Sequence, residues 1–239
     1  MSILASVIIP VYHDAAALER TLALTDFSGA ELIVAATPRD RTLTALRATR
    51  PDIVWIDAPA GRAIQMNAGA AFASAEWLLF LHADTRLPSS WTDAIAAADQ
   101  DRRVVAGCFA FALDSPAAIA RVIEIGVRVR VALFGLPYGD QALFVRRRVF
   151  EEMGGYGQLP IMEDVDLVRR LARRGRLYRS PLPALTSARR WHRDGWITRT
   201  GRHLFLIALY LCGVPPSRLI RLDAGRRTHP DGAPRRISL

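Results

Sequence analysis

In the first third of the chain, short runs of apolar and β-branched residues alternate with segments rich in alanine and leucine. Strands are predicted over 5–11, 31–36, 53–56 and 77–81, and helices over 15–24, 42–49 and 63–73. Each helix is long enough to cross over a sheet, so the strands can pair in parallel. This alternation constrains the fold most, because consecutive strand–helix–strand units build a parallel α/β sheet.

The alternation becomes less regular beyond residue 88. Helices are predicted over 89–98, 117–134, 147–153, 163–174 and 198–211, and strands over 104–113 and 141–145. The helix over 198–211 is expected to be the last ordered element. Arginine, glycine, proline and aspartate dominate from residue 224 onward, which indicates a solvated tail. We expect an α/β domain over 1–192, an apolar helical appendage over 193–223 and a flexible basic tail over 224–239.

The composition excludes several classes of protein. With 239 residues, 51% of them hydrophobic, the chain can build one domain core, and wholesale disorder is excluded. Its two cysteines, Cys108 and Cys212, are too few and too far apart for a disulfide framework or a zinc cluster. No basic segment precedes the first apolar run, so we expect no cleaved signal peptide and a cytoplasmic location.

All 32 basic residues are arginine, and they are unevenly distributed. Residues 167–239 hold 17 arginines and 3 acidic residues, whereas residues 1–166 carry a net negative charge. The chain has a net charge of +9. We nevertheless expect no binding to nucleic acid, because no recognised motif and no series of stacking aromatic residues accompanies the charge.

The helix predicted over 198–211 is too apolar on all sides for an ordinary surface helix, so another surface must cover it. The longest apolar run, 204–214, is too short to span a bilayer. Three placements stay open: packing on the main domain, pairing in a homodimer, or peripheral contact with the inner face of a membrane. In the last case Arg199 and Arg202 would meet anionic headgroups.

Two candidate sites follow predicted strands. Asp84 comes directly after the strand over 77–81, at the end where parallel sheets bind ligands, so it is the best candidate for a metal ligand. Capping of the next helix is the alternative for this carboxylate. The segment 57–70 opens a helix, where the amide of Gly61 and the fork of Arg62 suit phosphate or carboxylate. It lacks the glycine patterns of dinucleotide-binding and Walker loops.

Two charged clusters follow later in the chain. Glu163 and Asp164 begin a helix and, being adjacent, point to different sides, so one could meet an acceptor while the protein holds the other. Stabilisation of the helix N-terminus is the alternative. The run 189–192 joins two arginines, a tryptophan and a histidine, which suits a pyrophosphate beneath a flat ring or a plain surface cluster. His192 is also a candidate metal ligand.

Five motifs resemble family-2 glycosyltransferases in order and spacing. They are 6–12 (SVIIPVY), 65–70 (QMNAGA), 79–85 (LFLHADT), 139–141 (GDQ) and 163–167 (EDVDL). The resemblance covers about residues 5–192 and is nearest to a small bacterial subgroup labelled arsenosugar-biosynthesis glycosyltransferases, whose members read HADTRLP, PYGDQ, MEDV and SARRW. It implies a GT-A, Rossmann-like fold with a mixed, mostly parallel sheet flanked by helices, to which the C-terminal helical appendage is added.

The resemblance implies inverting transfer of a hexosyl-type sugar from a nucleotide-diphosphate donor to a hydroxyl acceptor, either a small molecule or lipid-linked, assisted by Mg²⁺ or Mn²⁺. It implies that Asp164 is the catalytic base, that Glu163 beside it belongs to the catalytic site, and that Asp84 binds the metal ion. The residues implied to bind the nucleotide sugar are Pro10, Val11, Tyr12, Asp14, Arg62, Gln65, Asn67, His82, Ala83, Asp84, Asp140, Gln141, Arg190 and Trp191.

The chain departs from the family pattern at two positions that concern the donor. His82 stands at the first aspartate of the DxD motif, and Ala35 stands where the family has a base-reading aspartate. A UDP-sugar is favoured as donor, with a GDP-sugar as the alternative. Two other functions stay open: a nucleotidyltransferase of similar layout, whose usual glycine-rich loop is missing from 10–14, and a non-catalytic module that binds nucleotide or lipid.

Overall fold

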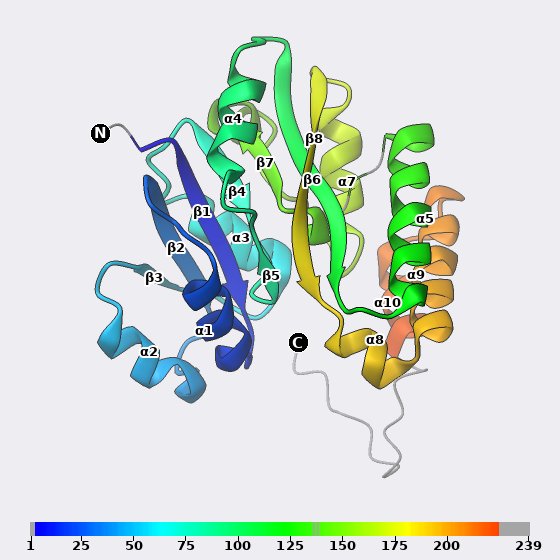
Figure 1. Cartoon of the computed structure of the whole chain (residues 1–239), viewed down its shortest axis with the longest axis horizontal. Coiled ribbons are helices and arrows are strands. Elements are labelled where there is room, and N and C mark those ends of the chain that lie inside the picture. The colour runs from blue at the N-terminus through cyan, green and yellow to red at the C-terminus, as the bar shows by residue number, and fades with distance from the viewer. Residues whose placement is uncertain (1–2, 136, 138, 225–239) are drawn as a thin grey trace.

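The computed structural model describes residues 3–135, 137 and 139–224. Within these residues, eight strands form one mixed sheet in the order β3-β2-β1-β4-β7-β6-β8-β5, and helices cover it (Figure 1). Four of its seven strand pairs are parallel. The predicted fold class, a mostly parallel α/β sheet flanked by helices, is confirmed.

The first half of the sheet is wholly parallel. β1 (Ala5–Val11) lies between β2 (Ala30–Ala36) and β4 (Trp77–Phe80), and β3 (Val54–Asp57) forms the edge. The connections contain α1 (Ala15–Leu24), the short η1 (Arg41–Leu43) with α2 (Thr44–Thr49), and α3 (Arg62–Ala70). The predicted bounds agree with these to within three residues, because each element carries its own periodicity.

The second half mixes strand directions. Its strands are β5 (Thr85–Arg86), β6 (Val104–Asp114), β7 (Leu143–Arg146) and β8 (Arg176–Ser187). Its helices are α4 (Trp91–Asp99), α5 (Ala118–Phe134), the short η2 (Gly139–Gln141), α6 (Arg147–Glu152), α7 (Glu163–Leu171), α8 (Arg189–Asp194), α9 (Trp196–Leu211) and α10 (Pro216–Ala224). β7 runs antiparallel to both β4 and β6, so the sheet changes direction there.

Besides the short elements β5, η2 and α8, which were not predicted, two longer parts of this half differ from the prediction. β8 was not expected, because Pro181 and Pro183 interrupt the sequence; the sheet accommodates them with an irregular register against β6, between Cys108 and Ala110. The expectation that 198–211 is the last ordered element is wrong, because α10 follows and buries Leu219 completely. The predicted tail beyond residue 224 lies outside the described residues.

The sheet is curled, and the curl builds the site. Only residues 81–84 connect β4 to β5, although β7, β6 and β8 lie between them in the sheet. This link reaches roughly 17 Å when extended, whereas four strand spacings in a flat sheet span about 19 Å. The link is shortened further by a turn in which Thr85 N donates to His82 O at 3.0 Å. The far edge of the sheet must therefore bend back toward the end of β4.

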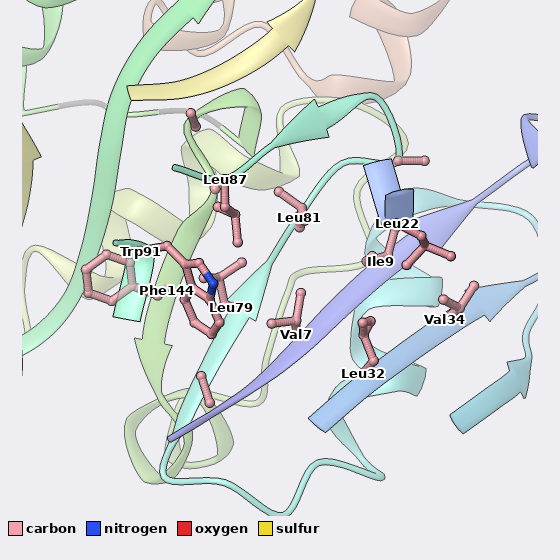
Figure 2. Close-up of a cluster of buried hydrophobic side chains, with 14 of the residues drawn as sticks. Val7, Ile9, Leu22, Leu32, Val34, Leu79, Leu81, Leu87, Trp91 and Phe144 are labelled. Carbon is pink, nitrogen blue, oxygen red and sulfur yellow. The ribbon is translucent and has the colours of Figure 1, made fainter. Parts of the chain in front are cut away.

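Apolar side chains cover both faces of the central strands. Val7 and Ile9 of β1 pack on one face, as Figure 2 shows, and Ile8 between them packs on the other. All three are fully buried or nearly so. Parallel strands covered on both faces read as continuous apolar runs, which is why β1 and β4 were recognisable in the sequence. The polar residues that follow these strands are thus held on a rigid support.

Candidate active site

Asp84 lies where the curl brings the end of β4 against the end of β8. Its backbone oxygen accepts from Ser187 N at 2.9 Å, and its side chain is only 4% exposed. Arg189 and Arg190, from the first turn of α8, reach its Oδ2 with their Nη2 atoms at 3.3 and 3.2 Å. The predicted metal carboxylate is therefore buried and paired with two arginines.

Arg189 also forms an ion pair with Asp14, which follows β1. Its Nη1 donates to Asp14 Oδ1 at 2.8 Å, and this bond raises the pKa of the guanidinium. A hollow of about 340 Å³ lies over the same residues, lined by His13, Asp14, Arg189, Arg190 and Arg193. We call this cluster, Asp14, Asp84, Arg189 and Arg190, the arginine end of the site. Such guanidinium groups around a hollow can bind a diphosphate.

A second cluster, which we call the acid end, contains Arg62, Asp140, Glu163 and Asp164. Arg62 Nε donates to Glu163 Oε1 at 2.5 Å, whereas its Nη2 is 3.8 Å from Asp164 Oδ2. Both carboxylates are buried at the start of α7. Among the described residues, Asp164 Oδ1 has no hydrogen-bond partner. Arg62 therefore forms a hydrogen-bonded ion pair with Glu163 and only a long ion pair with Asp164.

Burial is the main cause of the altered acidity of Asp164. It raises the pKa of this carboxyl to about 7, opposed by Arg62 and supported by the charges of Glu163 and Asp140. Burial also raises the pKa of Asp140, whose Oδ1 lacks a hydrogen-bond partner among the residues that the structure describes. A carboxyl with a pKa near 7 and a free oxygen can accept a proton from a bound hydroxyl at neutral pH.

His82 lies between the two ends. Its Nε2 is 3.4 Å from Arg62 Nη1, and burial together with Arg62 and Arg190 lowers its pKa well below the ordinary value. It is therefore a neutral ring at neutral pH and cannot replace the charge of the aspartate that the family has there. Gly139 makes the close approach possible, because a Cβ would lie 2.5 Å from Asp164 Oδ2 and 2.8 Å from His82 Nε2.

Three amide side chains that were predicted to bind the nucleotide sugar form hydrogen bonds with backbone atoms of the protein. Gln65 donates to Val11 O at 2.8 Å and Gln141 to Phe109 O at 3.0 Å. Asn67 Nδ2 donates to Tyr156 O at 2.9 Å, and Asn67 Oδ1 accepts from Tyr156 N at 2.8 Å. These bonds fix the loops that border the site. Direct contacts of these side chains with a nucleotide sugar stay predictions.

The remaining predicted residues lie around the arginine end. Pro10 and Val11 end β1, Tyr12 after them is 59% exposed, and Ala83 is buried beside Asp84. Trp191 and His192 turn toward α9 instead. Trp191 Nε1 donates to Thr200 Oγ1 at 3.2 Å, and the exposed ring of His192 packs edge-on against Trp196. Binding of the pyrophosphate by Trp191 and of a metal by His192 stay predictions.

Sequence reasoning placed Arg189 in a cluster suited to a pyrophosphate and Gly139 in a motif, but it predicted neither the pairing of Arg189 with Asp14 nor the close packing of Gly139, and it did not find the backbone strain around the site. Of the four described non-glycine residues with positive φ, His13, Ala142 and Met162 flank Asp14, Gln141 and Glu163 respectively. Such conformations cost free energy and cluster at functional sites. Residue type marks them poorly, because histidine is enriched at positive φ whereas alanine and methionine are not.

Comparisons with known proteins bear on the family and the fold. A model of the family described as glycosyl transferase family 2 matches residues 6–154. The mannosyltransferase PcManGT from Pyrobaculum calidifontis, solved with GDP-Man and Mn²⁺, superposes with a TM-score of 0.63 at 21% identity over 91% of this chain and 67% of its own. TarS from S. aureus, solved with UDP-GlcNAc, gives 0.56 at 16% over 77% and 58%. No curated protein matches. The structural likenesses show a GT-A fold.

Proposed function

The chain belongs to glycosyl transferase family 2, and we propose that it moves a hexosyl-type sugar from a nucleotide-diphosphate donor to a hydroxyl acceptor with inversion at the anomeric carbon. The observation that carries the reaction type is the asymmetry of the acid end. Glu163 is neutralised by Arg62 at 2.5 Å, whereas Asp164 keeps an oxygen without a partner among the described residues. One free carboxylate is what an inverting transfer needs.

Asp164 acts as the base in this proposal. Its pKa of about 7 lies near neutral pH, and its carboxylate holds a proton more strongly than that of an exposed aspartate would. Glu163 does not take the proton, because its charge is already paired with Arg62. Its part is to fix Arg62, and through it the position of Asp164.

The arginine end binds the donor. On binding, Arg189 and Arg190 exchange their contacts with Asp14 and Asp84 for the diphosphate oxygens, which accept bidentate hydrogen bonds from arginine as carboxylates do. This exchange frees Asp14 for the ribose hydroxyls. We favour a UDP-sugar donor and keep a GDP-sugar as the alternative, since the related structures hold UDP-GlcNAc and GDP-Man respectively. The resemblance to the arsenosugar subgroup stays a prediction.

Asp84 is the residue that would hold Mg²⁺ or Mn²⁺. Among the described residues no three His, Cys, Asp or Glu side chains cluster as a complete metal site. A single buried carboxylate nevertheless fits these ions, which take their other ligands from substrate phosphates and water. When bound, the ion would neutralise charge that develops on the leaving diphosphate. The chain itself contributes Arg189 and Arg190 beside the same carboxylate.

The test separates donor binding from transfer. Calorimetry with UDP, GDP, CDP and dTDP, with and without Mn²⁺, on the wild type and Asp84→Ala identifies the nucleotide and the role of the ion. Release of nucleoside diphosphate from matching sugars with simple alcohols, followed by NMR of the product anomer, tests inversion. Retention of configuration would contradict the mechanism. Binding without transfer to any acceptor, unchanged in Asp164→Asn, would favour a non-catalytic module.

A further inference from the structure

Helix α5 is apolar on two opposite sides. Its inner side packs Ala120, Ile123 and Val127 against Phe111 and Leu113 of β6. Its outer side carries a stripe that nothing among the described residues covers: Val122, Ile125, Val129 and Leu133 are 61%, 56%, 49% and 71% exposed. Spacings of three and four residues align these side chains along one face of the helix.

Helix α9 repeats this arrangement. It was expected to need cover on all sides, and the structure covers only one: Leu206 and Ile207 pack against Met162, Val165 and Leu219. Four large apolar side chains of α9 stay exposed: Ile197 at 82%, Leu204 and Phe205 at 51% each, and Leu211 at 46%. Packing on the main domain therefore buries some of the large apolar side chains of α9 and leaves others exposed.

The two helices lie along the same flank of the molecule, at the opposite end from β3 (Figure 1). Trp196, at the start of α9, packs in one apolar cluster with Ile123 and Val127 of α5. Nine of the fifteen exposed large apolar side chains in the described part of the chain belong to α5, α9 or α10. Such a concentration is unusual for a surface that faces only water. We call it the apolar flank.

The charges on the apolar flank are cationic. The acidic residues of α5 and α10 are buried and paired: Glu124 with Arg121 at 2.9 Å, and Asp223 with Arg202 at 3.4 Å. Arg128, Arg218 and Arg221 are exposed, and no carboxylate of the described residues lies within 4 Å of them. On a helical wheel, Arg121 and Arg128 lie together along one edge of the α5 stripe.

This combination selects one kind of partner. A face with exposed apolar side chains, arginines at its edge and no exposed acid is suited to a bilayer interface with anionic lipid, where apolar side chains enter the acyl boundary and arginines meet headgroups. A second copy is less suited, because a two-fold interface would bring the same arginines together. No described helix is long and apolar enough to cross the membrane.

We propose that α5 and α9 dock the protein on a membrane surface containing anionic lipid. The acid end borders this flank, because Leu206 and Ile207 of α9 pack in one cluster with Met162 and Val165, which flank Glu163 and Asp164 in the chain. A docked molecule thus holds its reacting carboxylates near the headgroups, where an acceptor hydroxyl on a lipid would lie. The docking itself does not depend on the proposed reaction.

The experiment is sedimentation of the full chain with vesicles of phosphatidylcholine alone or mixed with phosphatidylglycerol. The wild type is expected to sediment with the mixed vesicles, and less so as salt rises. The double variant V129D/L133D, whose positions are exposed, should bind roughly tenfold more weakly or worse. Phe72→Asp, at an equally exposed apolar residue outside the flank, should bind like the wild type.

Two outcomes would overturn the proposal. Binding that V129D/L133D leaves unchanged would assign membrane contact to another part of the chain. A stable dimer in analytical ultracentrifugation, dissociated by V129D/L133D, with no vesicle binding by the wild type, would assign the flank to a second copy. Equal melting temperatures of the variants and the wild type show that either result reports on the surface and not on folding.

Discussion

The two ends of the site hold their charges in opposite ways. At the arginine end, Asp84 faces two guanidinium groups at 3.2 and 3.3 Å, and the arginines extend into an open hollow. At the acid end, Glu163 and Asp164 share Arg62, with Asp140 near enough to raise the pKa of Asp164. Partly exposed arginines beside a hollow can exchange their carboxylate partners for an anionic ligand. An excess of buried carboxylate retains a proton instead.

The largest effect is expected from Asp164→Asn. The amide keeps the shape of the side chain and cannot take a proton, so the rate of sugar transfer should fall between about 10²- and 10⁴-fold. Donor affinity, measured by calorimetry, should stay within a factor of two or so because the arginine end is unchanged. Glu152→Gln, an exposed carboxylate of α6, is the matched control and should keep full activity.

If Asp164→Asn weakened donor binding by as large a factor as it lowered the rate of transfer, the division into two ends would be wrong. Such a result would show that Asp164 contacts the donor in the ground state. A normal rate would remove Asp164 from the chemistry altogether.

Arg62→Met should come next, with its main effect on stability. Removing the guanidinium leaves Glu163 and Asp164 buried without a cation. Breaking a fully buried pair costs about 3–5 kcal/mol; because Arg62 is 41% exposed, water screens part of this and we expect about 2 kcal/mol. Urea denaturation measures the loss. R62M/E163Q, which removes one of the stranded charges, should recover part of it.

If R62M/E163Q were no more stable than Arg62→Met, the loss would come from the packing of the arginine stem and not from uncompensated charge.

Arg189→Gln tests the arginine end with a smaller effect. The substitution removes a cation that bridges Asp14 and Asp84, so affinity for the nucleoside diphosphate should fall about tenfold, or ~1.4 kcal/mol. Stability should change by less than about 1 kcal/mol, since the pair is partly exposed. Arg47→Gln, which breaks the remote surface pair with Asp57, is the control and should leave affinity unchanged. Tighter binding by Arg189→Gln would mean that Arg189 only blocks the hollow.

The sequence predicted the support of the site better than its contacts. β1 and β4 were recognisable because both of their faces are buried. The position of Asp84 after β4 followed from parallel-sheet topology, whereas Asp14 was implied by the family resemblance. The pair of Arg189 with Asp14 joins residues 175 apart. It depends on the curl of the sheet and on β8, whose prolines hid it. No local pattern encodes such a contact.

The acid end shows the same limit. Its carboxylates could be listed from the sequence, but their roles depend on which of them Arg62 reaches. Helix geometry predicted only that Glu163 and Asp164 diverge. The close fit of Gly139 against Asp164 and His82, and the use of Asn67 to fix the backbone of Tyr156, are packing facts that emerge only after the chain has folded.

The smallest effect, and the most specific, is a change in pH dependence. A base must be deprotonated to act, so the rate of transfer should rise with pH through the Asp164 pKa of about 7. The charge of Asp140 raises that pKa, so Asp140→Asn should move the rise to lower pH. The sign for stability is opposite: the folded chain holds a proton that the unfolded chain loses above about pH 4, so stability should fall as pH increases toward 7.

Profiles of kcat/KM against pH for Asp140→Asn and for Asp93→Asn, an exposed carboxylate of α4, decide the point. A midpoint shifted only in Asp140→Asn would tie the altered acidity to the carboxylates crowded at the acid end. If Asp140→Asn left the midpoint unmoved, the charge of Asp140 would not contribute, and burial together with Glu163 and Arg62 would set the acidity of Asp164. Asp140 would then not belong to the group of carboxylates that distinguishes the acid end from the arginine end.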